Sequence, residues 1–500
     1  MDLWMDDVAL AAGLGDTVPP PSGRPPVDNL APRDVVGLAV ALVAYHARFA
    51  PLFARAEQRH WARKYLEGQL LELERKSIEP MALALDGGEV DTVQGMQQFI
   101  SVGAWEADLV LREHQRGVAE TLGDPATGVL IIDGCDFPKQ GTHSVGVARQ
   151  WCGALGKVAN CQASVVACYA SAQGFTLVDR QLFLPERWFT AAYKERWHDC
   201  GIPDGTAFRT KPALAAELIE TLHARGALPF GWVTVDEGFG KDPAFLDRVD
   251  RLGVGYFAEV PRNTLVWGER PQLAVPPATG KGRPATRERV GSGEPGAVRV
   301  DALTAQLPAT QWTRHRIKEG AKGPMVADFA TIRAVATRHG LPGPDVWVVL
   351  RRSLPDPEDV DAPLVLKYYL SNASAATPLA TFVWLSGMRW PVETAILEAK
   401  NELGLDHYEV RGWTGWQHHT ALTFLAHHFL VTVRLQLGKK ISGAHGVAST
   451  PTLGGDPPQT DARRRRRPDP PAAYAAPQLR RLLLPPAPDP ACPAGYLLTI

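Results

Sequence analysis

The chain has 500 residues, more than one domain usually contains, so two or three domains and a sizeable core are expected. Hydrophobic residues make up 45%, which fits a globular soluble protein, and the net charge of -1 neither requires nor excludes a nucleic-acid partner. The six cysteines contain no CxxC pair, and no apolar run reaches membrane-spanning length. We therefore expect neither a zinc site nor a disulfide framework, and no membrane-spanning helix.

The N-terminal part of the chain is predicted to be a short disordered segment followed by helices. Residues 1–30 are rich in proline and glycine and lack the basic and apolar regions of a signal peptide, so a cytoplasmic protein is expected. Residues 31–125 show helical apolar periodicity, as in Tyr65–Glu74 and Val93–Ile100. We therefore predict a helical domain over 31–125.

Residues 126–265 alternate strands with helices. Two apolar runs end in Asp133 and Asp236 and indicate buried strands that deliver a carboxylate, although a strand ending in Asp-Gly is often only a turn. The first three strands have short links that favour antiparallel pairing, and helices Lys211–Arg225 and Pro243–Leu252 favour parallel placement of the last two. The expected strands are 128–133, 161–170, 175–184, 231–236 and 254–260.

The last part of the chain divides into three predicted segments. Residues 266–375 begin with a Pro/Gly-rich stretch and continue with β-like runs, so a β-rich insertion is expected rather than a long loop. Residues 376–438 are predicted to be helical and to carry Glu393. Residues 439–500 are rich in proline and include Arg463–Arg467, which predicts a disordered tail that binds nucleic acid nonspecifically or is simply a solvated charge run.

Arg389, Glu393 and Lys400 lie at offsets of four and seven, so on a helix they share one face. An ordinary ion pair between Arg389 and Glu393 is the simpler interpretation. Together with the two strand-end aspartates, however, the glutamate could hold divalent metal ions against a phosphodiester.

This pattern resembles that of the DDE transposases of bacterial insertion sequences, in the group marked by a Tyr-Arg-Glu-Lys signature. Arg389, Glu393 and Lys400 match its last three members at the family spacing, and Ser386 stands at the tyrosine position. Further similar segments begin at Leu73, Asp133 and Glu402. The resemblance covers residues from about 45 to 435.

The resemblance implies the fold and the chemistry. The expected fold is α/β: a ribonuclease-H-like mixed sheet with a helical N-terminal domain and a β-rich insertion before the catalytic glutamate helix. Its first and fourth strands are neighbours, so Asp133 and Asp236 would lie side by side. With Glu393 they would be the catalytic residues and would bind two Mg²⁺ ions, with Mn²⁺ as an alternative.

The resemblance also implies double-stranded DNA as the partner, both as terminal inverted repeats and as target. Arg389, Lys400 and Lys157 would contact DNA, and the helical domain would contact phosphates through Arg75 and Lys76, with Arg63 and Lys64 beside them. A solvated helix face is the alternative for these four. A homodimer on DNA in the bacterial cytoplasm, associated with the nucleoid, is expected.

Several residues compete with these assignments. Glu398 is the alternative acid on the glutamate helix, Asp136 competes with Asp133, and Glu237 with Asp236. Trp267 and Trp312 would suit stacking on an unpaired base or core packing. His418, His419, His427 and His428 are assigned to helix packing rather than to metal binding.

Two other functions remain open from the sequence. One is a catalytically impaired DNA-binding protein derived from a transposase, because Ser386 removes a residue that positions DNA phosphate in the family. The other is a metal-dependent nuclease without strand transfer.

Overall fold

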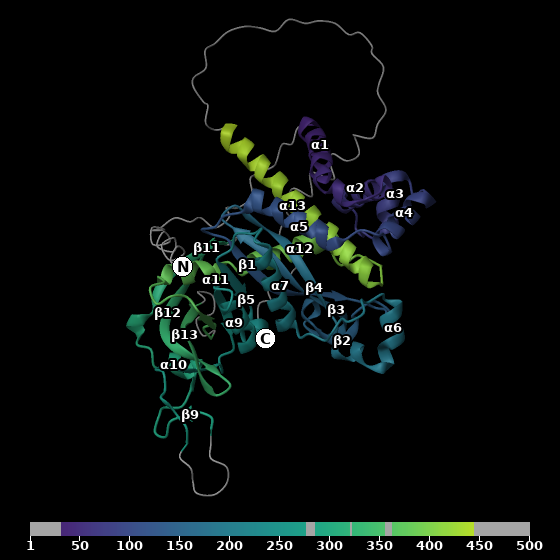
Figure 1. The fold of residues 1–500 in the computed structure, drawn as a ribbon. Helices are drawn as coiled ribbons and strands as arrows, with labels where there is room; N and C mark the ends of the chain where they lie inside the picture. Colours follow the sequence, from purple (N-terminus) through teal and green to yellow (C-terminus); the bar gives the residue numbers. More distant parts are fainter. Residues whose placement is uncertain (1–31, 277–285, 321–322, 356–362, 445–500) are drawn as a thin grey trace, which may run out of the picture. The chain divides into compact units, whose positions relative to one another are not determined.

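The computed structural model of the protein describes residues 32–276, 286–320, 323–355 and 363–444 (Figure 1). Two compact units divide the chain: the first contains His114–Ile396, and the second contains Gly23–Glu113 with Leu397–Ile500. The second unit therefore combines the predicted helical domain with the C-terminal part of the chain, a division that differs from the predicted boundaries. The proposed disordered segment 1–30 and most of the proposed tail 439–500 lie outside the described residues.

The first unit is built on a sheet whose centre has the strand order β4-β3-β1-β5-β6. Strand β1 pairs antiparallel with β3 and parallel with β5, and β5 pairs parallel with β6. This is the arrangement expected for a ribonuclease-H-like sheet, with the first and fourth predicted strands side by side. The bounds are β1 Val129–Pro138, β3 Lys157–Ser171, β4 Gly174–Phe183, β5 Trp232–Val235 and β6 Gly255–Val260.

The region 266–375 extends this same sheet instead of forming a separate one. Strand β14 pairs with β6, and β13, β12 and β7 follow in order, with β11 beside β12 and β10 beside β7. The bounds are β7 Leu265–Trp267, β10 Val298–Arg299, β11 Thr313–Gly320, β12 Gly323–Arg338, β13 Leu341–Ser353 and β14 Leu366–Ser371. Strands β8 Leu273–Ala274 and β9 Arg289–Val290 form a small ribbon, and α10 spans Val300–Thr304.

Strand β2 (Ala148–Cys152) was not predicted from the sequence. It pairs antiparallel with the first residues of β3, because Gly156 adopts a left-handed conformation (φ 60°) at the turn between them. The five described cysteines are all buried and unbridged.

The helices of the first unit have recognisable start and stop signals. Helix α7 (Lys211–Arg225) begins after Thr210, whose hydroxyl accepts a hydrogen bond from the Ala213 N–H at 3.3 Å, and ends at Gly226 (φ 62°). Helix α9 (Pro243–Asp250) is capped by Asp242 in the same way. Helix α7 packs on β3 and β4. The remaining helices are α6 Lys194–Asp199, α8 Glu237–Gly240, α11 Leu379–Gly387 and α12 Trp390–Asn401.

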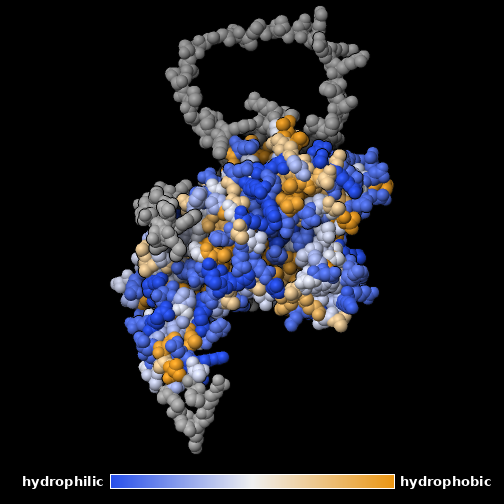
Figure 2. Space-filling view, viewed as in Figure 1, coloured by the Kyte–Doolittle hydropathy of each residue, from blue (hydrophilic) through white to orange (hydrophobic). Residues whose placement is uncertain are grey.

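The second unit is helical. Helix α13 (Trp413–Ala444) packs against α2 and α4, and the large apolar side chains that it buries include Trp416, Leu422 and Phe424, each no more than 1% exposed. It extends beyond the predicted end at residue 438. The N-terminal helices are α1 Pro32–Phe49, α2 Ala56–Leu70, α3 Ile78–Asp86, α4 Val90–Ser101 and α5 Ala107–Leu122. Figure 2 shows hydrophobic residues in scattered patches among hydrophilic ones on the viewed face.

Candidate active site

The two predicted aspartates lie at one edge of the sheet. Ile132 of β1 is level with Val235 of β5, so the next residues, Asp133 and Asp236, follow at the same level on adjacent parallel strands. The Asp133 carboxylate accepts a hydrogen bond from the Gly134 N–H at 2.7 Å. Asp236 directly follows β5 and caps α8, where its carboxylate accepts a hydrogen bond from the Phe239 N–H at 3.3 Å. This edge therefore presents two carboxylates, each held by a hydrogen bond from a nearby backbone N–H.

Helix α12 brings the third predicted acid into the first unit's site through an arginine. Arg389, the residue before the helix, forms an ion pair with Glu393 one turn later. Its Nη1 atom also lies 3.7 Å from Oδ2 of Asp133. The guanidinium thus joins a strand carboxylate to the helix carboxylate, so Asp133 and Glu393 share one cation. Glu393 remains 45% exposed, whereas Asp133 is 17% exposed.

The charges of this site are not balanced. Burial first, and then the negative charge of Asp236, raise the pKa of Asp133 to about 7, because Arg389 offsets only part of these two effects. Burial also raises the pKa of Asp236, against the influence of Arg389 and of the Phe239 N–H. A buried carboxylate whose pKa is raised by a neighbouring negative charge favours the binding of positive charge.

The carboxylates of Asp133, Asp236 and Glu393 are chemically suited to bind a divalent cation. Carboxylate oxygens are the ligands that Mg²⁺ prefers, and the raised pKa of Asp133 shows negative charge that a cation would relieve. Within the described ranges, however, no group of three His, Cys, Asp or Glu residues lies close enough to hold one ion together. Arg389 occupies the position between Asp133 and Glu393, so binding an ion there requires its displacement.

A fourth carboxylate, Glu259, was missed by the sequence reasoning. It lies on β6, level with Asp236, because Val235 pairs with Ala258. Lys367 of β14 donates to both of its carboxylate oxygens, at 2.8 and 3.1 Å. The signal was present in the sequence, since the predicted strand 254–260 also carries an acid near its C-terminal end.

The three competing acids have other partners or positions. Asp136 accepts a hydrogen bond from the Gly153 N–H at 2.6 Å and lies 3.8 Å from the Lys211 ammonium. Glu237 is the first residue of α8, not a strand residue. Glu398 lies 2.9 Å from Arg434 and 3.3 Å from His427 in the second unit.

The proposed DNA contacts differ in accessibility. Lys157 is exposed at the start of β3, and Lys400 lies half-buried in the last turn of α12. Arg75 is exposed but lies 2.5 Å from Glu409. Lys76 differs from the prediction, because it is 3% exposed and its ammonium donates to the carbonyls of Gln69, Leu71 and Glu402. We therefore leave Lys76 out of the proposed DNA contacts.

The other basic residues of the helical domain are ion-paired. Arg63 pairs with Glu67 at 3.0 Å, and Lys64 pairs with Asp86 at 2.8 Å. These pairs agree with the alternative that the residues belong to a solvated helix face.

The tryptophans and histidines also find places in the structure. Trp267 is 3% exposed, a core position that leaves no face for a base, whereas Trp312 lies beneath the guanidinium of Arg352, 4.2 Å from the ring centre. The four histidines of α13 are buried, as the packing interpretation predicts. His418, for example, bonds the carbonyls of Ile100 and Trp105 at 2.9 Å each.

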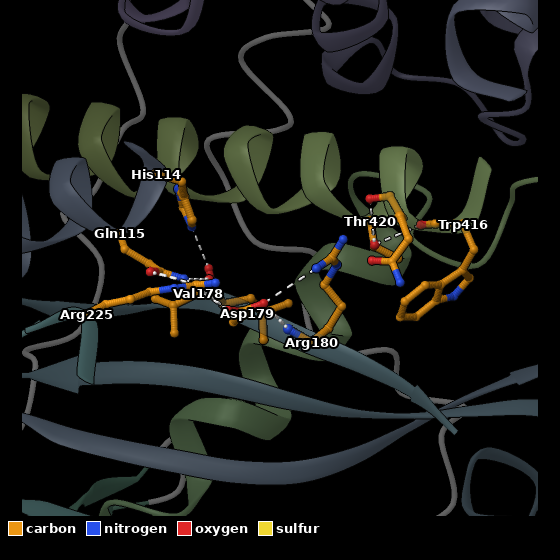
Figure 3. A network of polar contacts seen from close by, with 10 residues as sticks. His114, Gln115, Val178, Asp179, Arg180, Arg225, Trp416 and Thr420 are labelled. Carbon is orange, nitrogen blue, oxygen red and sulfur yellow. Dashed lines mark hydrogen bonds and ion pairs between the residues drawn. The ribbon is translucent and has the colours of Figure 1, made fainter. Parts of the chain in front are cut away.

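A buried acid elsewhere in the first unit shows what a structural carboxylate looks like (Figure 3). Asp179 of β4 lies 2.9 Å from the Arg225 guanidinium of α7 and accepts from the Gln115 side chain of α5 at 3.1 Å. His114 contacts the neighbouring Leu177 carbonyl at 2.8 Å. These contacts tie two helices to an outer strand and leave the Asp179 charge compensated.

The comparisons with known proteins agree with this architecture. Residues 48–324 match the family described as DDE superfamily endonuclease, more than half of the chain, so the protein belongs to that family. The matched range contains Asp133, Asp236 and Glu259 and ends before Glu393.

A relative is the probable transposase for insertion sequence element IS701 from Microchaete diplosiphon. The chain is 29% identical to it over 206 residues, which cover 41% of this chain and 49% of the relative. The match thus spans about half the length of that protein. Among the described helices, none is long and apolar enough to cross a membrane.

Proposed function

We propose that the protein is a DNA transposase that binds the ends of its element, hydrolyses phosphodiester bonds and joins the freed 3′ end to target DNA. The observation that carries the proposal is the level placement of Asp133 and Asp236 on paired parallel strands, with Arg389 linking Asp133 to Glu393. Membership of the DDE endonuclease family and the similarity to a probable transposase support it.

Asp133, Asp236 and Glu393 would hold two Mg²⁺ ions, or Mn²⁺, which supply an activated water or hydroxyl and stabilise the leaving oxygen. Arg389 pairs with two of these carboxylates in the structure, so it would exchange them for a DNA phosphate. The guanidinium therefore contributes positive charge to the phosphodiester rather than moving a proton, since arginine stays charged at all working pH values.

DNA would approach along further cations. Lys157 and Lys400 are proposed phosphate contacts, and exposed Arg75 would add one in the helical domain by exchanging Glu409 for phosphate. The partners are double-stranded DNA, as terminal inverted repeats and as target, and a second copy of the chain in a homodimer on DNA. We place this activity in the bacterial cytoplasm, at the nucleoid.

A nicking assay tests the proposal. The protein is incubated with Mg²⁺ and a plasmid carrying the DNA that flanks its gene, and with the same plasmid lacking that DNA. We expect cleavage at the junctions with Mg²⁺ and none with Ca²⁺ or chelator. Asp133→Asn should lower the rate at least about a thousandfold, or ~4 kcal/mol of barrier, with DNA affinity kept.

The alternative is a DNA-binding protein without chemistry. Ser386 favours it, because it is 8% exposed and its hydroxyl donates to the Val383 carbonyl at 2.7 Å instead of facing a phosphate. Specific binding of the flanking DNA with no Mg²⁺-dependent cleavage would establish this alternative and contradict the proposal.

A further inference from the structure

Three adjacent strands each bring one acid to the same level of the sheet. The pairs Ile132 with Val235 and Val235 with Ala258 set this level. One residue further on stand Asp133, Asp236 and Glu259. Residues that are level on neighbouring strands project to the same face of a sheet. Glu259 therefore shares its face with the two aspartates, and Tyr369 of β14 continues this row.

Glu259 is largely buried and brings a cation with it. Its side chain is 15% exposed and binds the Lys367 ammonium through both oxygens, at 2.8 and 3.1 Å. Lys367, 37% exposed, comes from β14, the last strand before the glutamate helix. The β-rich region thus supplies a cation directly to the catalytic edge.

The charge of Glu259 also acts on the other site residues. After burial, it is one of the influences that raise the pKa of Asp236. It also contributes, after Glu393 and Asp133, to keeping Arg389 charged despite that side chain's burial. The charge of Glu259 therefore acts on the same guanidinium as Glu393 and Asp133.

We propose that Glu259 is a positioning residue of the active site, which holds Lys367 and helps to hold Arg389 where both can meet a DNA phosphate. This inference rests on the proposed function. A lysine without this carboxylate would be drawn to the remaining acids of the site and would neutralise them. Glu259 holds the Lys367 ammonium beside β6. Asp133, Asp236 and Glu393 thus stay available for metal ions.

Cleavage by Glu259→Gln tests the proposal. The rate is measured in single turnovers at saturating DNA and Mg²⁺, where a positioning residue affects the rate constant rather than the affinity. We expect the rate to fall by about tenfold, with the thermal midpoint within about 2 °C of that of the unaltered protein. Lys367→Met should have a similar effect, and the double variant should be no slower than the slower single variant.

A matched control lies in the same unit. Glu220 binds Arg248 through both oxygens at 2.7 and 2.6 Å, and neither residue is among the site residues. Glu220→Gln should leave the rate unchanged. An unchanged rate in Glu259→Gln, or a loss that raised Mg²⁺ or Mn²⁺ restores, would overturn the proposal; the latter would make Glu259 a metal ligand.

A binding measurement keeps the test independent of cleavage. If Lys367 meets a phosphate, Lys367→Met reduces the dependence of log affinity for duplex DNA on log salt by about 0.9. Glu220→Gln should leave this slope unchanged. An unchanged slope in Lys367→Met would overturn the inference. Absence of Mg²⁺-dependent cleavage in the unaltered protein would instead overturn the proposed function.

Discussion

Helix α12 carries two acids whose surroundings differ in kind. Glu393 shares Arg389 with Asp133, in a site where the pKa of Asp133 is raised to about 7, chiefly by burial and then by Asp236. Burial alone would also raise the pKa of Glu398, but His427 and Arg434 outweigh it and lower this pKa to about 2. The Glu398 cluster is complete within the protein, whereas the Asp133 cluster lacks positive charge. An acid already satisfied by the fold is structural, and a charge deficit marks the place for a ligand.

The largest expected effect on stability separates the two clusters. Glu398→Gln removes a buried charge and leaves Arg434 without its carboxylate partner, so we expect a loss of about 3 kcal/mol in the free energy of unfolding. Denaturant unfolding at pH 7 measures it. Glu393→Gln, on the same helix but 45% exposed, serves as the control and should change stability far less. Equal losses would contradict the comparison.

The pH dependence of stability should differ in sign between the clusters. Because the pKa of Glu398 is lower in the folded state, its contribution is present above the unfolded pKa and is lost as pH falls from about 4.5 to 2. The folded pKa of Asp133 is raised instead, so the folded state binds the extra proton between about pH 4 and 7, and stability falls as pH rises through that range.

Asp133→Asn should therefore raise the thermal midpoint at pH 8 and leave it nearly unchanged at pH 4, where the folded carboxyl is protonated and, like asparagine, uncharged. Thermal unfolding in metal-free buffer at the two pH values measures this. A lower midpoint at pH 8 would mean that the Asp133 charge is as well compensated as that of Glu398.

The smallest expected effect concerns a single proposed DNA contact. Lys400→Ala should weaken duplex binding and reduce the slope of log affinity against log salt by about 0.9, the value for one lost phosphate contact. Fluorescence anisotropy at a series of salt concentrations measures the slope. The control is Arg209→Ala, which removes a cation paired with Glu217 at 2.7 Å. If the two variants have the same slope, Lys400 has a structural role.

The sequence predicts the centre of the fold well because its signals are local. Apolar runs that end in Asp133 and Asp236 predict the strands, and the helices between the last two strands predict their parallel pairing. The pairing of the first and fourth strands was implied by the family resemblance instead. The level position of Glu259 could not be predicted, since it depends on the register between β5 and β6. The strand β2 was missed because it is short and carries the exposed Trp151 between polar and buried neighbours.

The burial of individual charged groups could not be predicted from the sequence. A basic residue beside an acidic helix resembles a phosphate contact, and only the tertiary structure shows that Lys76 is enclosed by three carbonyls. Likewise, the sequence spacing of His427 gives no sign of its acidic neighbour Glu398, which lies 29 positions earlier in the chain and 3.3 Å away.

We propose that the Asp133 cluster, and not the Glu398 cluster, cleaves DNA. The most direct measurement compares Mg²⁺-dependent nicking by Glu393→Gln and Glu398→Gln, at equal DNA occupancy and at a temperature where both variants are folded. We predict that Glu393→Gln loses cleavage by at least about a hundredfold, or ~2.7 kcal/mol, and that Glu398→Gln cleaves at the rate of the unaltered protein. Loss of cleavage in Glu398→Gln with normal cleavage in Glu393→Gln would contradict the assignment.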